Sequence, residues 1–515
     1  MESAAIPVSA SDPEGSAAGG KGLKTGALGY ISNLVIGVAS TAPGYSLAAT
    51  LGFVVAVGGM GFHAPAVMIV SFIPMLLIAA AYYYMNRADP DCGTSFTWVT
   101  RAMGPRLGWL TGWAIVVTDV IVMAALAYIA GVYTFLLFGL DAAATNLLDV
   151  SIVAAIWIIV MTWICWVGIE LSARTQYFLL AAEIAALALF AAVALAKVYF
   201  GDPGGFHVQA DWFNPFTLHG GTTALVDGVL LGVFIYWGWD SGVCVNEESR
   251  DSANGPGRAA VMSTILLVLI YVVVATAAQA YAGTTFLKHH GDDVLSALGG
   301  PVLGSPLDKI LIIAVLTSAS ASTQTTILPT ARTTLSMARF GSIPKIFGRI
   351  HPRYLTPDVS TLVMGAVSLI WTLVIINVSQ NVLSDSITGI GFGIAFYYGL
   401  TGYACVVYYR KEIFKSLKNF IMVGVAPFLG GAMLTFIFVK AFFDYKTTST
   451  DVNYSGGFLG VGTPVAIGVG GLLLGVVVLV FANIAYPKFF KRKWETADPG
   501  VLEGTVKGEA SVMSD

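Results

Sequence analysis

Charged residues are scarce in this sequence. Asp, Glu, Lys and Arg make up 11% of its 515 residues, whereas hydrophobic residues make up 56%. An average soluble domain carries roughly 25% charged residues, so a water-soluble core could not hide this much apolar surface. The formal net charge of −3 also lacks the basic excess of nucleic-acid-binding proteins, and we expect no nucleic-acid partner.

Paired cysteines and catalytic motifs are lacking too. Cys92, Cys165, Cys244 and Cys405 show no CxxC spacing, which argues against a disulfide framework or a metal site. The glycine-rich GIGFG at 389–393 has no strand before it, so it indicates close helix packing and not nucleotide binding. No set of nucleophile, base and oxyanion donors is apparent. We therefore expect neither an enzyme nor a bound cofactor or metal.

Long apolar runs recur from Tyr30 to Tyr486. A helix needs about 20 apolar residues to cross a bilayer. The sequence thus predicts an all-α, polytopic membrane protein whose surroundings are lipid. Its twelve predicted spans lie near residues 29–56, 61–86, 108–138, 149–168, 175–200, 222–247, 258–283, 307–338, 359–378, 386–409, 420–443 and 462–486.

Positive charges are distributed unequally between the two sides that these spans define. Five of the 27 Lys and Arg residues lie on the side opposite the amino terminus: Lys197, Lys288, Lys309, Lys440 and Lys446. By the positive-inside rule both termini are expected in the cytoplasm, for a multi-pass protein of a bacterial-type inner membrane. Residues 1–28 lack the apolar core of a signal peptide and are predicted to be a disordered cytoplasmic tail, with a second tail at 488–515.

The first predicted span contains a helix-breaking stretch, ASTAPGYS at 39–46. Pro43 cannot donate a backbone hydrogen bond and is suited to the first position of a new half-helix. In that case the amides of Gly44 and Tyr45 point toward the middle of the membrane, together with the positive end of the dipole. The carbonyl near Ala39 would face the same gap.

The sixth predicted span is interrupted as well, by YWGWDSG at 236–242, where Gly238 and Gly242 flank Asp240. Unpaired backbone groups are not tolerated against lipid, so each break must face protein or water. Matching breaks in the first and sixth spans are typical of an inverted five-plus-five repeat with a binding site at the midplane. The alternative is that each is a kink packed against its neighbours.

Four stretches carry a family resemblance: STAPGYS at 40–46, GTSFTWVTRAMGPRLGWLTGW at 93–113, YWGWDSGVCVNEES at 236–249 and ARTTLSMARFGSIPKIFGRIHPRYLTP at 331–357. Over residues 25–490 the chain resembles the amino acid, polyamine and organocation permease superfamily. The resemblance implies inverted repeats at 29–200 and 222–410, two further helices at 418–487, and alternating access around a central site. Most such permeases import amino acids or amines with the proton gradient.

One departure from the family pattern concerns the first break. Many amino-acid members have glycines where this chain has Thr41, Ala42 and Pro43, which removes one amide that could bind a substrate carboxylate. The predicted substrate-binding residues are Ala39, Ser40, Thr41, Ala42, Gly44, Tyr45, Asp119, Tyr236, Trp237, Gly238, Trp239 and Asp240.

Three carboxyl groups are predicted inside the membrane, where such groups are costly and commonly functional. Counting from the inner boundary, Asp119 lies ~16 Å, Glu183 ~14 Å and Asp240 ~10 Å deep. No Lys or Arg lies at these depths, and all three are proton-coupling candidates. The stretch around Glu183, LLAAEIAALALF at 179–190, resembles the fifth-span stretch in which some proton-coupled members of the family place a lysine. The alternatives are a protonated Glu183 bonded to a neighbouring helix, Asp119 as a tie between helices, and Asp240 as a helix N-cap.

Other residues have two interpretations each. The rings of Tyr236, Trp237 and Trp239 either stack on a substrate or pack as bulk, and at most two can face one cavity. The hydroxyls of 316–326 in the eighth span either bind sodium with first-span carbonyls or pack closely. Four inner charges form either a cytoplasmic latch or a solvated loop; they are Glu247, Glu248, Arg250 and Arg339.

These observations together favour a secondary transporter over a channel, because no ring-forming filter motif is apparent. The expected solute is small and bears an amino group. Amino acids imported by proton symport are the favoured class. The alternatives are an amine or polyamine permease, in which Asp240 and Asp119 bind cationic nitrogen, and a sodium-coupled transporter. The sequence does not indicate an oligomeric state.

Overall fold

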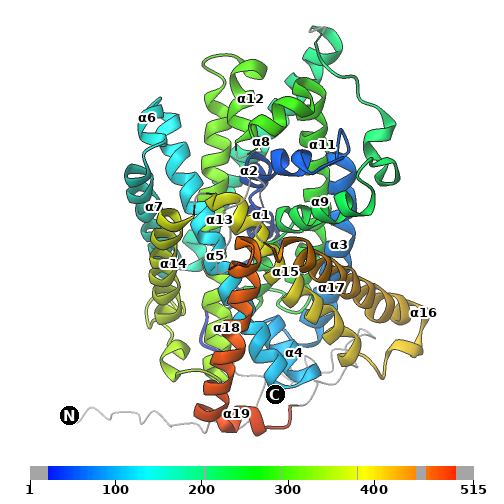
Figure 1. Cartoon of the computed structure of the whole chain (residues 1–515). Helices are drawn as coiled ribbons and strands as arrows, with labels where there is room; N and C mark the ends of the chain where they lie inside the picture. The colour runs from blue at the N-terminus through cyan, green and yellow to red at the C-terminus, as the bar shows by residue number, and fades with distance from the viewer. Residues whose placement is uncertain (1–20, 202–203, 292, 380, 448–459, 495–515) are drawn as a thin grey trace, which may run out of the picture.

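Helices are the only regular elements in the residues that the computed structural model describes, 21–201, 204–291, 293–379, 381–447 and 460–494 (Figure 1). One isolated bridge pairs Leu28 with Ser249. The predicted all-α class is confirmed.

Eleven helical segments of this described part are long and apolar enough to cross a membrane. They are α1 (Tyr30–Thr41) with α2 (Pro43–Ala56), α3 (Ala64–Ala88), α5 (Pro105–Leu137), α7 (Leu147–Val167), α8 (Ile169–Phe200), α11 (Gly255–His289), α13 (Lys309–Arg339), α14 (Asp358–Val378), α15 (Val382–Tyr408), α16 (Leu417–Asn419) with η6 (Phe420–Val425) and α17 (Ala426–Tyr445), and α18 (Thr463–Ala485).

The predicted sixth span is not a continuous helix. α9 (Gly221–Ile235) has 15 residues, and a non-helical stretch separates it from the single turn of α10 (Ser241–Cys244) and from η3 (Asn246–Glu248). Neither helical piece is long enough to cross a bilayer by itself. This interruption accounts for the difference between twelve predicted spans and eleven long apolar segments.

The remaining helices are short. They are α4 (Ser95–Met103), α6 (Asp141–Ala144), η1 (Ala210–Phe213), η2 (Pro215–Thr217), α12 (Val294–Leu303), η4 (Lys345–Gly348), η5 (Ile413–Lys415) and α19 (Pro487–Lys491). In Figure 1, α4 and α19 lie at the lower end of the bundle, and α6 and α12 lie at the upper end. The lower end, where residues 21–28 lead into α1, is called the inner end below.

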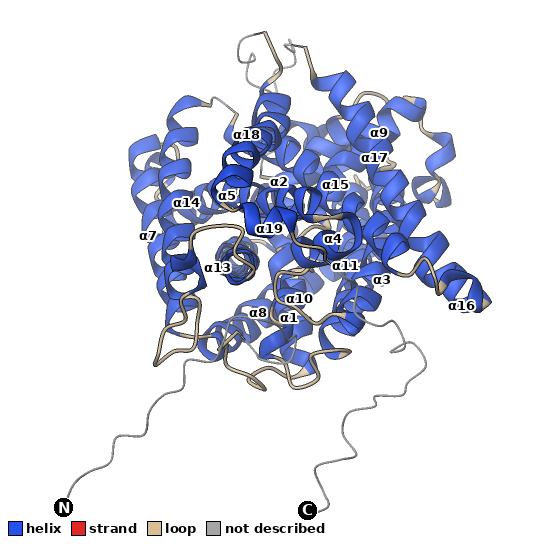
Figure 2. Cartoon of the chain, turned by 90° about the horizontal axis from the view of Figure 1, so that it is seen from below, coloured by secondary structure: helices blue, strands red, loops and turns tan. Residues whose placement is uncertain are grey.

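Burial separates a central group of helices from a peripheral one. The most apolar window of α1 and α2 is 89% buried, whereas that of α18 is 22% buried. Large apolar side chains on one face of α7 are exposed at Ile152, Ile156, Ile159 and Trp163. Their spacing of three to four residues gives a continuous apolar stripe suited to lipid. Seen along the bundle, α7 and α14 lie at its rim (Figure 2).

α13 connects the parts of the bundle that matter for the site. It packs against both pieces of the first broken segment, α1 and α2, and against α8, α10 and α5. α15 packs against α9 on the other side. The two interruptions therefore lie in the interior, among α8, α13 and α15.

Part of the predicted amino-terminal tail is packed against the inner end. The amide of Leu28 donates to the carbonyl of Glu248 at 3.0 Å, and the amide of Arg250 donates to the carbonyl of Leu28 at 2.9 Å. Leu23 and Leu28 are buried. The prediction of a disordered tail is wrong for residues 21–28, because backbone pairing and two leucines fix this segment; residues 1–20 lie outside the described residues.

Candidate functional site

The first segment is broken where its proline predicts a break. α1 ends at Thr41, and α2 begins with Pro43. Between them, Ala42 has a φ of 48° and a ψ of 66°, a region that residues other than glycine sparsely populate. The amide of Ala42 donates to the carbonyl of Ala39 at 3.1 Å. The carbonyl of Ala39 therefore has a hydrogen-bond partner within the break, although Pro43 has no N–H to donate to it.

Protein groups occupy both predicted amides at the start of α2. Gly44 N–H donates to Oε1 of Glu183 at 2.6 Å, and Tyr45 N–H donates to Oγ of Ser318 at 3.0 Å. The Ser318 hydroxyl donates to the same Glu183 oxygen at 2.8 Å. Glu183, on α8, thus joins α2 to α13. Its other oxygen, Oε2, is buried and has no hydrogen-bond partner among the described residues.

The second break lies between α9 and α10. Gly238 has a φ of 116°, a conformation that L side chains rarely adopt. A Cβ at Gly238 would lie 2.8 Å from the carbonyl oxygen of Ser40 in the first break. The hydroxyls of Ser40 and Ser241 are 2.8 Å apart, and Ser322 of α13 donates to the Ser40 carbonyl at 2.7 Å. The two breaks are therefore in direct contact.

Asp240 precedes α10 but does not cap it with its side chain. Its Oδ1 accepts a hydrogen bond from the Tyr398 hydroxyl at 2.9 Å, and its Oδ2 accepts one from the Tyr397 hydroxyl at 3.1 Å. Both tyrosines belong to α15. The interpretation of this carboxyl group as an N-cap is wrong, because the hydroxyls of α15 bind both of its oxygens.

Aromatic rings surround Asp240. Trp237 Nε1 donates to the Tyr397 hydroxyl, and the ring of Trp239 lies 5.1 Å from that of Tyr398. Tyr236 points elsewhere, because its hydroxyl donates to the carbonyl of Met68 in α3. Of the three predicted aromatic residues, the two tryptophans therefore share contacts with the tyrosines that bind Asp240.

Asp119, on α5, is hydrogen-bonded to a different helix. Its Oδ2 accepts from the Thr330 hydroxyl of α13. This contact fits its interpretation as a tie between helices, and no hydrogen bond among the described residues joins it to either break. Asp119 is the one predicted substrate-binding carboxyl group that the structure does not bring into contact with the interruptions.

The three carboxyl groups share one electrostatic feature. Glu183, Asp119 and Asp240 are buried, with exposed fractions of 0%, 1% and 3%. None of the ion pairs in the described part of the chain includes them. A buried carboxyl group without a cationic partner is a common feature of proton and ligand sites in membrane proteins.

A family model described as amino acid permease matches residues 27–464, which is most of the chain. The chain belongs to this family. The transporter resemblance stated from the sequence is confirmed, and this permease is a polytopic transporter of the membrane.

Two relatives of this permease are named for different solutes, and a third is an uncharacterized transporter. An uncharacterized transporter of Mycobacterium tuberculosis is 28% identical, over 57% of this chain and 63% of the relative. The low-affinity putrescine importer PlaP of Escherichia coli is 20% identical, over 73% and 81%. The branched-chain amino acid permease BcaP of Lactococcus lactis is 22% identical, over 58% and 63%. The match thus spans less than two thirds of the mycobacterial relative's length.

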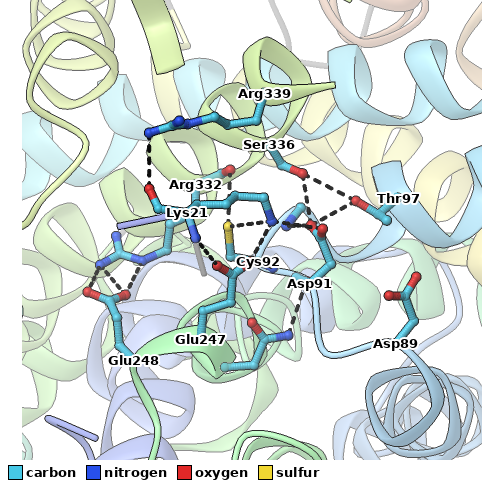
Figure 3. Close-up of polar contacts among 12 residues, drawn as sticks. Lys21, Asp89, Asp91, Cys92, Thr97, Glu247, Glu248, Arg332, Ser336 and Arg339 are labelled. Atoms are coloured by element: carbon cyan, nitrogen blue, oxygen red, sulfur yellow. Dashed lines mark hydrogen bonds and ion pairs between the residues drawn. The ribbon is translucent and has the colours of Figure 1, made fainter. Parts of the chain in front are cut away.

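Ion pairs connect the inner end of the permease (Figure 3). Lys21 Nζ lies 2.7 Å from Asp91 Oδ2 and 2.5 Å from Glu247 Oε1. Arg332 donates to Glu248 through Nε at 2.6 Å and through Nη2 at 2.8 Å. The network joins the segment before α1, the loop after α3, the end of the second break and α13.

The predicted latch residues are only partly correct. Glu247 and Glu248 do form ion pairs, but with Lys21 and Arg332. Arg339 Nη2 instead donates to the carbonyl of Lys21 at 3.1 Å, and Arg250 Nε donates to that of Gly26 at 3.3 Å. Sequence reasoning missed Lys21 because it lay in the predicted tail, and it missed Arg332 because the residue was counted among the positive charges of the cytoplasmic side.

The surroundings of Lys21 and Asp91 shift the pKa of both. Burial disfavours the charged form of Lys21, but Asp91 together with Cys92 and Glu247 outweighs it, so the pKa of Lys21 is raised above its ordinary value. Burial likewise opposes ionisation of Asp91, yet Lys21 holds the pKa of that carboxyl group below its ordinary value. Asp91, Cys92 and Glu247 have ligand atoms within 4.8 Å of one another, as in a metal site. The Lys21 ammonium contacts all three and supplies the positive charge there.

The eighth-span hydroxyls contact the first break. Ser318 and Ser322 of α13 bind Tyr45 and Ser40 respectively, whereas Thr323 donates to the carbonyl of Ala319 in its own helix. The two serines thus satisfy backbone groups of the first break. Sodium binding by the hydroxyls of residues 316–326 stays a prediction.

Sequence reasoning also missed Tyr397, Tyr398 and Thr330, the partners of Asp240 and Asp119. The available signal was the adjacent tyrosine pair in the apolar tenth predicted span. Because the rotation of α15 relative to α10 cannot be read from hydropathy, nothing distinguished these hydroxyls from the many others.

Proposed function

We propose that this permease imports a small solute bearing an amino group by proton symport, with alternating access around its two helix breaks. This proposal rests on the direct contact of the two breaks at Gly238 and Ser40. Buried carboxyl groups that have no ion-pair partner in the described residues lie beside that contact. Broken helices supply midplane sites in secondary transporters because their dipole ends and unwound backbone groups face solutes and ions.

The proposed architecture counts the second broken segment as a span. α9, residues 236–240 and α10 together would then cross the membrane and complete twelve spans, with inverted repeats at 29–200 and 222–410. The excess of Lys and Arg on one side supports cytoplasmic termini and a bacterial-type inner membrane. On this basis the ion pairs of Lys21 and Arg332 close the cytoplasmic end.

Asp240 is the proposed acceptor for the amino group. Its carboxyl group is oriented by the hydroxyls of Tyr397 and Tyr398, and the rings of Trp237 and Trp239 lie against those tyrosines. A buried carboxylate provides charge for an ammonium group, and nearby aromatic rings add cation–π attraction. When the solute is absent, the tyrosine hydroxyls satisfy the carboxylate oxygens.

Glu183 is the proposed proton carrier. In its ionised form it accepts from the Gly44 amide and from Ser318 at the positive end of α2, an arrangement that favours negative charge. A proton on Glu183 removes that charge and weakens the attachment of α2 to α8 and α13. Protonation would therefore be coupled to movement of the outer half of the first span. Asp119 and Asp240 are the other proposed proton sites.

Amino acids are the solute class that the sequence favours, and relatives are named as transporters of branched-chain amino acids and of putrescine. Amines are a second candidate, supported by the occupied amides of α2. Sodium is the competing coupling ion.

The test is uptake by the purified permease in liposomes. A panel of amino acids and amines is supplied under an imposed proton gradient, an imposed sodium gradient, or neither. We expect accumulation of one solute class under an inward proton gradient and its loss when an ionophore collapses that gradient. Accumulation that follows only the sodium gradient, or flux at the rate of a channel, would contradict the proposal.

A further inference from the structure

The start of α2 has no amide left for a substrate anion. Pro43 has no N–H, Gly44 donates to Glu183, Tyr45 donates to Ser318, and Ser46 donates to the carbonyl of Ala42 at 2.8 Å. The first amides of a helix and its dipole normally form a site for a carboxylate or a phosphate. Here the carboxyl group of Glu183 already occupies that position.

Glu183 also makes the position unfavourable for a second carboxylate. An anion near the Gly44 amide would approach within a few ångströms of Glu183 Oε1, in a fully buried environment. While Glu183 is ionised, like charges at such a distance repel one another, and burial strengthens the repulsion. A Cβ at Gly44 would lie 3.3 Å from Glu183 Oε1, so the two groups are already in close contact.

Positive side chains do not replace the lost anion site. Among the described residues, Arg332 is the Lys or Arg with the least exposed side chain, at 2%. Its guanidinium group donates to both oxygens of Glu248, through Nε and Nη2, and Nη1 donates to the carbonyl of Leu328. Lys21 at the inner end is 12% exposed and is paired with Asp91 and Glu247. Within the described part of the chain, the interior near the breaks thus contains carboxyl groups, Asp240 among them, and lacks a free cationic group to bind a substrate carboxylate.

We propose that Glu183 is a specificity-determining residue: it fills the anion position at the start of α2, so that the permease selects amines over the amino acids that carry an additional α-carboxylate. The inference rests on the proposed transport function and narrows its solute class. Removal of the Glu183 carboxyl group frees the Gly44 amide and, through Ser318, loosens the contact to Tyr45. Both amides then become available to a carboxylate.

The test uses pairs of solutes that differ only in the α-carboxylate, such as putrescine with ornithine and isoamylamine with leucine. Binding of each member to the purified permease is measured by competition, which does not depend on proton coupling, and uptake into liposomes is measured in parallel. The variants are Glu183→Ala and Glu183→Gln. The matched control is Glu170→Gln, on the exposed part of the same helix α8.

We expect the unmodified permease and the Glu170→Gln variant to bind the amine of each pair about 10-fold or more tightly than the amino acid. A tenfold difference in affinity requires only a modest difference in binding free energy. Glu183→Ala should reduce this preference to about 3-fold or less by improving binding of the carboxylated member. Equal or tighter binding of the amino acids by the unmodified permease overturns the inference, and so does an unchanged preference in both Glu183 variants.

Failure of this inference differs from failure of the proposed function. If no solute of either class is taken up by the unmodified permease, the transport proposal fails. If amino acids accumulate under the proton gradient and the amines do not, transport stands and the role of Glu183 in specificity is refuted.

Discussion

The ion pair between Arg332 and Glu248 allows a quantitative prediction. The guanidinium group donates twice to the carboxylate, at 2.6 and 2.8 Å, and the side chains are 2% and 0% exposed. Arg332→Gln leaves the Glu248 carboxylate buried without its partner. Removing one member of a buried pair costs about 3–5 kcal/mol, because the remaining charge has lost its compensation. We expect a loss of that size in the free energy of unfolding.

The assay is unfolding of the purified permease in mixed micelles with increasing SDS, followed by circular dichroism. The control is Lys24→Gln, since Lys24 and Glu170 form an exposed ion pair with side chains 44% and 48% exposed. An exposed pair contributes at most about 1 kcal/mol. Replacing both buried partners by apolar residues should recover most of the stability that Arg332→Gln loses. A loss for Arg332→Gln no larger than that of Lys24→Gln would refute the reasoning.

Three further predictions concern the breaks and the inner end. Glu183→Gln should retain solute exchange between the two sides but lose at least about 10-fold of accumulation driven by a proton gradient, a difference visible in parallel exchange and uptake assays. Gly238→Ala should reduce uptake sharply and lower stability by about 1–3 kcal/mol, since the φ of 116° and the Ser40 carbonyl both oppose a Cβ; Gly58→Ala, where a Cβ meets nothing within 4 Å, is the control. Lys21→Gln should lower the melting temperature at pH 7. Lys21 holds the pKa of Asp91 below its ordinary value of 3.8, so the ion pair stabilises the fold only while Asp91 is ionised. The difference in melting temperature between the variant and the unmodified permease should therefore fade as the pH falls below 3.8.

Structural features that depend on the local sequence were predicted correctly. Hydropathy located the long apolar segments because each must satisfy its backbone groups within itself in lipid. Pro43 and Gly238 located the two breaks, since a missing N–H and a positive φ are properties of single residues. Neither inference required knowledge of the neighbouring helices.

The unpredicted features depend on contacts between distant segments. Tyr397 and Tyr398 bind Asp240 across 157 and 158 residues of chain, and Lys21 reaches Glu247 across 226. Such partners are set by helix rotation and packing, on which hydropathy carries little information. Asp240 illustrates the limit: its place before α10 suggested a cap, whereas the hydroxyls of α15 bind its carboxyl group instead.

Proton movement on solute addition tests the central claim most directly. The permease is reconstituted in liposomes that contain a trapped pH-sensitive dye, without an imposed gradient, and a transported solute is added outside. Proton symport predicts acidification of the lumen that depends on the solute and is absent from Glu183→Gln. Solute entry with no change of internal pH, measured in the same liposomes, would contradict the account.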